Sequence, residues 1–296
     1  VSTEAAWELW QDTDLLIGIG SRCELQYLRW TGMMRADDRP AGPKLIRIEI
    51  DPMELLRLKP DVGIVADAVD GALALAKAAA KNFSRTAGAR DRIAEAKAIA
   101  RTRIEKIQPH VAYLDIIRAV LPRDGIFVKD ICQSGFTSYF AFPVYEPRSY
   151  ISSGYQGNLG YAFPTALGAK VAYPDKPVVA VVGDAGFNFA VQELATMAEH
   201  QIGLSVILFN NGALGNVKRD QQTRFEGRTI ASELPNPSYA AMAESYGVAG
   251  YRVDSPAALK PVLEKSLADN KPAMIEVSLD LKDEVSPWEF IIHGAG

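Results

Sequence analysis

One strand–helix–strand unit near the middle of the chain constrains the fold more than any other feature. Two apolar segments, 178–183 and 204–209, have the composition of buried strands, and 187–200 between them is predicted to be the crossover helix. A right-handed crossover returns the chain to a neighbouring parallel strand, whose end then lies about 5 Å from the first. Asp184 follows the first strand and Asn211 follows the second. We therefore expect both side chains at the edge where open α/β sheets bind ligands.

These strand ends predict a metal site that is open to a ligand. A Mg²⁺ ion takes about six oxygen ligands and usually draws the remainder from water and substrate phosphates. The backbone after Asp184 is small, at Ala185 and Gly186, and leads into a helix amino terminus that can receive an anion. The pattern favours a metal-bound diphosphate. The alternatives are that Asp184 only caps a helix and that 210–212 is an ordinary Asn-Gly turn.

Several motifs resemble those of the thiamine diphosphate enzyme superfamily, which includes acetolactate synthases, pyruvate oxidases and 2-oxo acid decarboxylases. They are GDA at 183–185 with NN at 210–211, the glycine-rich SSGYQGNLGYAFPTALGA at 152–169, DICQS at 130–134 and QELAT at 192–196. The motifs occur in the family's order and cover roughly 109–281.

The resemblance implies thiamine diphosphate and Mg²⁺ as cofactors. It implies Mg²⁺ ligation by the side chains of Asp184 and Asn211 and by the backbone carbonyl of Ala213. The residues implied to bind the cofactors are Gln133, Ser134, Gly154, Gly157, Leu159, Gly183, Asp184, Ala185, Gly186, Asn211 and Ala213.

Some of these residues have individual roles in the resemblance. The carbonyl of Gly157 would accept a hydrogen bond from the pyrimidine amino group, and Leu159 would wedge beneath the bent cofactor. The alternatives are that these glycines are flexible loop residues, that Leu159 is plain core, and that 133–134 is a polar loop without function. Two positions depart from the family: Ala185 stands where Gly is usual, and Ser134 stands where His is common.

The resemblance also implies what the whole enzyme would contain. The Glu that activates the cofactor belongs to an amino-terminal pyrimidine-binding domain that is not found in this sequence, so no catalytic residue is assigned. We expect a carboxyl-terminal portion or one piece of a split enzyme, inactive alone. The whole protein would decarboxylate or carboligate a 2-oxo acid as a lyase or transferase, in an acetolactate synthase-like manner. It would assemble as a homodimer or tetramer. The alternative is a non-catalytic cofactor-binding or assembly module.

The organisation predicted from the sequence has three parts. Residues 1–83 are expected to be the second half of a Rossmann-like middle domain, 84–108 a connecting helix, and 109–296 the diphosphate-binding domain with a carboxyl-terminal tail. The last part is predicted to be a doubly wound, mostly parallel six-stranded α/β sheet, with strands near 125–128, 150–152, 178–182, 204–209, 249–253 and 273–277.

The first part raises the question of a second cofactor. Several members of the resembled family bind FAD in the middle domain, so FAD is a candidate here. Gly18-Ile-Gly20 lacks the third glycine of a dinucleotide fingerprint and is better explained as a turn at a strand end.

Composition narrows the class of protein. The formal net charge of −4 and the pI near 5.6 give no electrostatic basis for binding nucleic acid or an acidic membrane. No apolar run approaches the roughly 18 residues of a membrane span. Cys23 and Cys132 lack metal-ligand spacing and are predicted to be reduced thiols. We expect a cytoplasmic enzyme.

Overall fold

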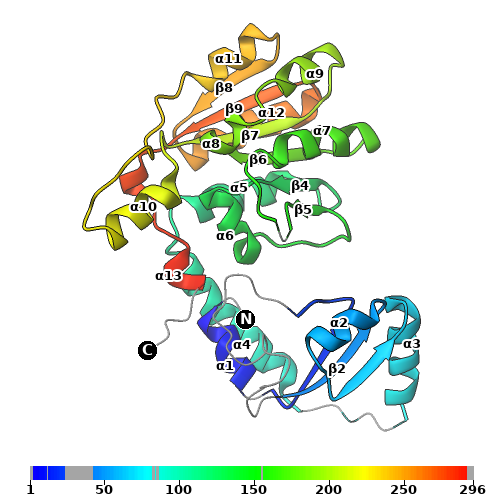
Figure 1. Ribbon diagram of the computed structural model, residues 1–296. Coiled ribbons are helices and arrows are strands. Elements are labelled where there is room, and N and C mark those ends of the chain that lie inside the picture. Colours follow the sequence, from blue (N-terminus) through cyan, green and yellow to red (C-terminus); the bar gives the residue numbers. More distant parts are fainter. Residues whose placement is uncertain are drawn as a thin grey trace. The chain divides into compact units, whose positions relative to one another are not determined.

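A computed structural model of the chain describes residues 3–11, 13–23, 43–81, 84, 87–154 and 156–291. The chain forms two compact units, Val1–Thr102 with Trp288–Gly296, and Arg103–Pro287 (Figure 1). Among the described residues, no helix is both long enough and apolar enough to cross a bilayer. The domain boundaries expected after residues 83 and 108 remain predictions, and the end of the expected tail, 292–296, lies outside the described residues.

The larger unit contains a six-stranded sheet in the order β5-β4-β6-β7-β9-β8, and every neighbouring pair is parallel. The strands are β4 Ile126–Lys129, β5 Tyr150–Ser152, β6 Val178–Gly183, β7 Ser205–Asn210, β8 Ala249–Val253 and β9 Ala273–Ser278. They lie where the sequence predicts them, which confirms the α/β fold. The register pairs Gly183 of β6 with Phe209 of β7, so the two carboxyl ends meet at one edge.

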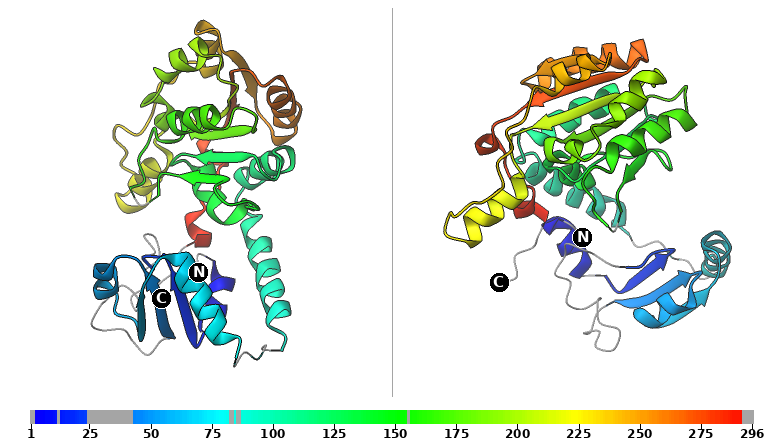
Figure 2. Two further views of the ribbon diagram at one scale, coloured as in Figure 1. Left: turned by 90° about the vertical axis from the view of Figure 1, so that its right-hand side faces the viewer. Right: turned by 45° about the horizontal axis from the view of Figure 1, so that its top comes forward.

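Helices cover both faces of this sheet (Figure 2). On one face, α7 Ala162–Ala172, α9 Glu193–Glu199 and α11 Tyr239–Ser245 share a buried cluster with alternate residues of β6 and β7. Two further helices, α5 His110–Val120 and α12 Pro256–Asp269, contact each other, and α12 also contacts β7 and β9. Every residue of β6 is buried, as expected for a parallel strand that is covered on both sides.

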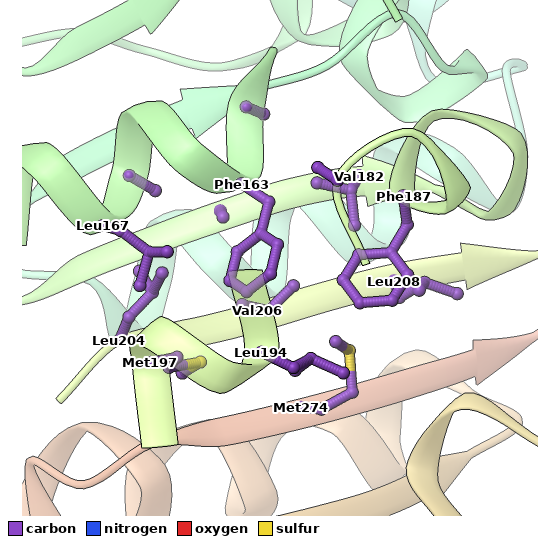
Figure 3. Close-up of a cluster of buried hydrophobic side chains, with 14 of the residues drawn as sticks. Phe163, Leu167, Val182, Phe187, Leu194, Met197, Leu204, Val206, Leu208 and Met274 are labelled. Carbon is purple, nitrogen blue, oxygen red and sulfur yellow. The ribbon is translucent and has the colours of Figure 1, made fainter. Parts of the chain in front are cut away.

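The core beneath α9 fixes the two central strands relative to each other (Figure 3). Leu194 and Met197 are fully buried, and they share a cluster with Phe163 of α7 and with Val206 and Met274 of the sheet. Burial of each large apolar side chain contributes about 1.5–3 kcal/mol. The positions of the residues that follow β6 and β7 are therefore set by a rigid, well-packed layer.

The crossover between β6 and β7 differs from the prediction of one helix over 187–200. The structure has two short helices, α8 Asp184–Asn188 and α9. Between them, the backbone makes hydrogen bonds of the 3₁₀ type, from residue i+3 to residue i, in place of the α-helical pattern. Examples are Ala190 N–H to Phe187 O and Glu193 N–H to Ala190 O. This break turns both Phe187 and Leu194 into the core. Asp184 is the first residue of α8.

The smaller unit has a three-stranded parallel sheet, ordered β1-β2-β3. Its elements are α1 Glu4–Gln11, β1 Leu15–Ile19, β2 Lys44–Glu49, α2 Pro52–Arg57, β3 Val62–Val65, α3 Ala68–Ala79, most of α4 Ala89–Ile104, and α13 Trp288–Ile291. Asp51 and Asp67 cap α2 and α3, each accepting a backbone N–H at 2.8 Å. Gly20 has a φ of 54°, which fits the predicted turn at the end of β1. FAD binding here stays a prediction.

Candidate functional site

Asp184 meets the turn that follows β7, as the sequence predicts. Its Oδ2 accepts the N–H of Gly212 at 2.9 Å and the amide Nδ2–H of Asn236 at 2.7 Å. Its Oδ1 accepts the N–H of Ala185 at 2.8 Å. Gly183, and not Asp184, is the residue that precedes α8, so the alternative that Asp184 only caps this helix does not describe the geometry.

The Asp184 carboxylate is buried without a charged partner. The residue is 3% exposed, and within the described ranges no lysine, arginine or histidine forms an ion pair with it. Burial raises the pKa of Asp184 above its ordinary value, although its hydrogen bonds oppose that shift. An unpaired buried carboxylate is costly, so this position favours a bound cation.

Asn211 lies beside Asp184 and has both ends of its amide engaged. Oδ1 accepts the N–H of Ala213 at 3.2 Å, and Nδ2 donates to Glu284 Oε1 at 2.8 Å. Gly212 has a φ of 67°, so the segment also forms the turn expected from the Asn-Gly pair. The turn and the candidate ligand are therefore features of one structure.

The backbone carbonyl of Ala213 is directed away from the segment that pairs with it. Ala213 lies opposite Glu233 in an isolated antiparallel bridge. The flanking residues make the hydrogen bonds: Gly212 O accepts from Leu234 N–H, and Leu214 N–H donates to the carbonyl of residue 232. Residues between such bonds turn their own N–H and C=O outward. The carbonyl of Ala213 is thus directed away from 232–234, which fits its predicted role as a metal ligand.

A cavity of about 170 Å³ lies at this edge of the sheet. The predicted site residues that line it are Gln133, Leu159, Gly183, Asp184, Ala185, Gly186, Asn211 and Ala213. Ser134 is buried one residue further along, with its Oγ 2.8 Å from Nδ1 of the cavity-lining His110. Gly154 and Gly157 lie in a loop with positive φ and are not among the lining residues. The structure therefore gathers most of the predicted set.

Asp130 ties three segments together next to this cavity. The residue is fully buried at the end of β4, and Oδ2 accepts the N–H of Gly160 at 3.1 Å. A Cβ on Gly186 would lie 3.0 Å from the same oxygen, which explains why a glycine occupies that position. Burial raises the pKa of Asp130, and backbone hydrogen bonds oppose that shift. The glycine-rich loop is thereby held against α8.

Gln133 begins α6 Gln133–Ala141 and Cys132 caps it, and both residues line the cavity. Cys132 accepts the N–H of Gly135 on Sγ, and burial raises the pKa of its thiol to about 12. Both cysteines of the chain are free, as predicted. Gln133 Nε2 donates to Asn216 Oδ1 at 2.8 Å, while its buried Oε1 has no partner among the described residues. A buried polar atom of this kind is expected to accept a hydrogen bond from a ligand or a water molecule.

Sequence reasoning missed the amino terminus of α10 Gly215–Arg224. Leu214, Gly215, Asn216 and Val217 line the cavity, so the first N–H groups of this helix lie at the site. Free N–H groups at a helix start favour anions. The helix is strongly polar and has no buried residue, so it lacks the apolar periodicity that reveals helices in a sequence.

Sequence reasoning also missed Asn236, which lies behind the candidate ligands. Its Nδ2 donates to Asp184 Oδ2 at 2.7 Å and to Asn210 Oδ1 at 2.9 Å, so it joins the ends of β6 and β7. The Tyr239 hydroxyl lies 3.0 Å from both Asn236 Oδ1 and Asn188 Oδ1 and can donate its one proton to either. No motif marks Asn236, because its role depends on a loop that returns to the sheet from 26 residues away.

Three comparisons place the chain among known proteins. The family described as "Thiamine pyrophosphate enzyme, C-terminal TPP binding domain" matches residues 130–277. A probable acetolactate synthase large subunit from Methanocaldococcus jannaschii is 31% identical over 292 residues, which are 94% of this chain and 48% of the relative. A probable 2-ketoarginine decarboxylase from Pseudomonas aeruginosa is 33% identical over 246 residues, which are 82% of this chain and 43% of the relative.

A solved structure shows the same fold. The thiamine diphosphate-dependent 4-hydroxybenzoylformate decarboxylase of Rhodococcus jostii aligns with a TM-score of 0.71 at 22% identity, over 92% of this chain and 50% of that one. The chain thus spans about half the length of the curated relatives it matches.

Proposed function

Because this chain belongs to the thiamine pyrophosphate enzyme family, we propose that its larger unit binds thiamine diphosphate through a Mg²⁺ ion held by Asp184, Asn211 and Ala213. The observation that carries the proposal is the buried Asp184 carboxylate, which has no charged partner in the described part of the chain. It lies against the 210–212 turn at the carboxyl ends of two parallel strands.

The donor set fits a hard divalent cation. A carboxylate, a carboxamide and a backbone carbonyl are the oxygen ligands that Mg²⁺ takes. Within the described residues, no group of three or more His, Cys, Asp or Glu side chains could hold a metal ion by itself. The cation would therefore complete its coordination with oxygens of the diphosphate and water.

The diphosphate would lie against α8 and α10. Gly186 lies in the first turn of α8 and Gly215 begins α10, and both line the cavity with Asn216. Backbone N–H groups there can donate to phosphate oxygens. Gln133, Gly183 and Ala185 complete the proposed contacts, while direct contacts by Ser134, Gly154 and Gly157 stay predictions.

We propose that the whole protein decarboxylates or carboligates a 2-oxo acid, as a lyase or transferase. When bound, thiamine diphosphate supplies a nucleophilic carbon and an electron sink for this chemistry. The chain's own residues bind and orient the cofactor, and Leu159, which lines the cavity, would exclude water from its rings. The curated relatives include proteins named as a synthase and as a decarboxylase, so we propose both carboligation and decarboxylation as candidate reactions of the whole protein.

We propose further that these 296 residues need a pyrimidine-binding domain and are inactive alone. The coverage of about half of each relative supports a larger whole protein. A homodimer or tetramer would bring that domain to the site of another subunit. Assembly state and a cytoplasmic location stay predictions from the sequence.

The alternative function is a cofactor-binding or assembly module without catalysis. Joining a pyrimidine-binding domain to the chain distinguishes the two functions. Release of CO₂ from at least one of several 2-oxo acids would establish the enzyme, whereas cofactor binding without CO₂ release would establish the module.

Calorimetric titration of thiamine diphosphate in the presence of Mg²⁺ tests the binding proposal. We expect saturable binding to the chain, loss of binding in EDTA, and loss of binding in the Asp184→Ala variant. Asp220→Ala is the matched control, because it removes a carboxylate that is 60% exposed on α10. Equal binding by the chain and by Asp184→Ala would refute the proposal.

A further inference from the structure

A chain of buried polar contacts leads from the wall of the cavity to Asn211. Ser134 Oγ lies 2.8 Å from His110 Nδ1, and His110 Nε2 lies 3.2 Å from Glu284 Oε2. Asn211 Nδ2 then donates to Glu284 Oε1 at 2.8 Å. The side chains of His110 and Glu284 are each 1% exposed, and both residues line the cavity.

The residues that make these polar contacts come from opposite ends of the larger unit. His110 is the first residue of α5, and Glu284 directly follows the short helix η1 Leu281–Asp283. Val285 N–H donates to Gln108 O at 2.9 Å and holds the two segments together. Glu284 is therefore fixed by the backbone hydrogen bond of the next residue, Val285, and by its own contact with the His110 ring.

Burying Glu284 has a cost that its partners offset only in part. A carboxylate removed from water needs a charged or strongly hydrogen-bonded partner. In the described part of the chain, its oxygens face a histidine ring and a neutral amide. Such an arrangement contributes little to stability compared with an apolar residue of the same size. Of these two side-chain contacts, the one to Asn211 joins Glu284 to a candidate cation ligand.

Glu284 and the N–H of Ala213 together set the orientation of the Asn211 amide. The oxygen and the NH₂ group of an asparagine have nearly the same shape, so only their hydrogen-bond partners distinguish them. A carboxylate accepts hydrogen bonds, so Glu284 selects the NH₂ end. The N–H of Ala213 selects the Oδ1 end. Only the oxygen can ligate a cation.

We propose that Glu284, held by His110, is a positioning residue that turns Asn211 Oδ1 toward the divalent cation. This inference rests on the proposed function, because it takes the cation to lie between Asp184 and Asn211. Partners behind metal ligands typically alter metal affinity 10–100-fold when they are removed, and we expect an effect of about that size.

The first test measures Mg²⁺ affinity by calorimetry in the presence of saturating thiamine diphosphate. Glu284→Ala should weaken Mg²⁺ binding about 10–100-fold. Glu284→Gln keeps an acceptor oxygen for Asn211 and should bind Mg²⁺ much like the unaltered chain. Asp283→Ala removes the exposed neighbouring carboxylate and should change nothing. Unfolding midpoints establish that each variant is folded. If Glu284→Ala does not fold, Glu284→Met, which keeps the volume but removes the acceptor oxygens, carries the test with the same expected loss of Mg²⁺ affinity.

The second test separates orientation from general support. Asn211→Asp has oxygens at both ends and needs no orienting partner, but it places a carboxylate against Glu284. Adding Glu284→Ala to Asn211→Asp should therefore raise Mg²⁺ affinity, whereas the same change lowers it in the chain with Asn211. A loss of affinity in both backgrounds would overturn the positioning role.

The outcomes distinguish this inference from the proposal on which it rests. If the unaltered chain binds Mg²⁺ with thiamine diphosphate no better than Asp184→Ala does, the proposed function is wrong and the inference fails with it. If Asp184→Ala loses binding while Glu284→Ala binds as the unaltered chain does, only the positioning role of Glu284 is wrong.

Discussion

Replacing Gly186 by alanine tests whether the start of α8 is held against Asp130. A Cβ at this position would lie 3.0 Å from Asp130 Oδ2 and 3.2 Å from its Cγ. Asp130 has little room to move away, since its carboxylate accepts the N–H of Ile131 at 2.6 Å and of Gly160 at 3.1 Å. Either the helix or the carboxylate must shift by a few tenths of an ångström.

Two opposing effects determine the magnitude. Alanine is favoured over glycine within a helix by about 1 kcal/mol. Overpacking of a rigid buried site costs about 1–3 kcal/mol, and each hydrogen bond to a charged group that is weakened loses part of roughly 1.5–3 kcal/mol. We expect Gly186→Ala to lower the free energy of unfolding by about 1–2 kcal/mol.

Gly168→Ala is the matched control within the same unit. Gly168 is exposed on α7, and no atom lies within 4 Å of a Cβ built there. This change should raise the free energy of unfolding by about 0.5–1 kcal/mol. Urea unfolding followed by circular dichroism measures both variants. If Gly186→Ala is as stable as Gly168→Ala, the close approach to Asp130 does not exist.

Three further predictions concern the surroundings of the site. Asn236→Ala removes the donor shared by Asp184 and Asn210 and one of the two acceptors of the Tyr239 hydroxyl, which keeps Asn188 Oδ1, so urea unfolding should show a loss of about 2–4 kcal/mol; a loss below about 0.5 kcal/mol would contradict the network. Burial raises the pKa of Tyr239 to about 12, so from about pH 10 to pH 12 the folded chain keeps a proton that the unfolded chain has lost, and stability falls as pH rises. In Tyr239→Phe, the free energy of unfolding should fall less steeply between about pH 10 and pH 12, by about 1.4 kcal/mol per pH unit. An unchanged dependence of unfolding free energy on pH would refute the assignment. Leu194→Ala should cost about 2–5 kcal/mol in urea unfolding because the residue is fully buried, and a cost below 1 kcal/mol would contradict the packing of α9.

The sheet could be predicted from the sequence because its strands are continuous apolar runs. Val178–Gly183 and Ser205–Asn210 are buried on nearly every residue, and parallel strands with both faces covered have this composition. The adjacency of Asp184 and Asn211 followed from the handedness of the crossover. The break between α8 and α9 could not be predicted, because the spacing of the apolar residues in 187–200 is compatible with one continuous helix and with two short ones.

The site was only partly predictable, because some of its groups are brought in by the fold and not by a motif. Glu284 reaches Asn211 from 73 residues away, and Asn236 reaches Asp184 from 52. His110 gave no signal, since a single histidine at a helix start has no ligand spacing. Ser134 was named by the resemblance, but its contact with His110 is visible only in the structure.

A crystal structure of the chain grown with thiamine diphosphate and Mn²⁺ in place of Mg²⁺ tests the central claim most directly, because anomalous scattering locates the metal. We expect one Mn²⁺ ion with Asp184, Asn211 Oδ1 and the Ala213 carbonyl as ligands, and the diphosphate at the amino terminus of α10. A metal ion bound away from Asp184, or a cofactor outside this cavity, would contradict this claim.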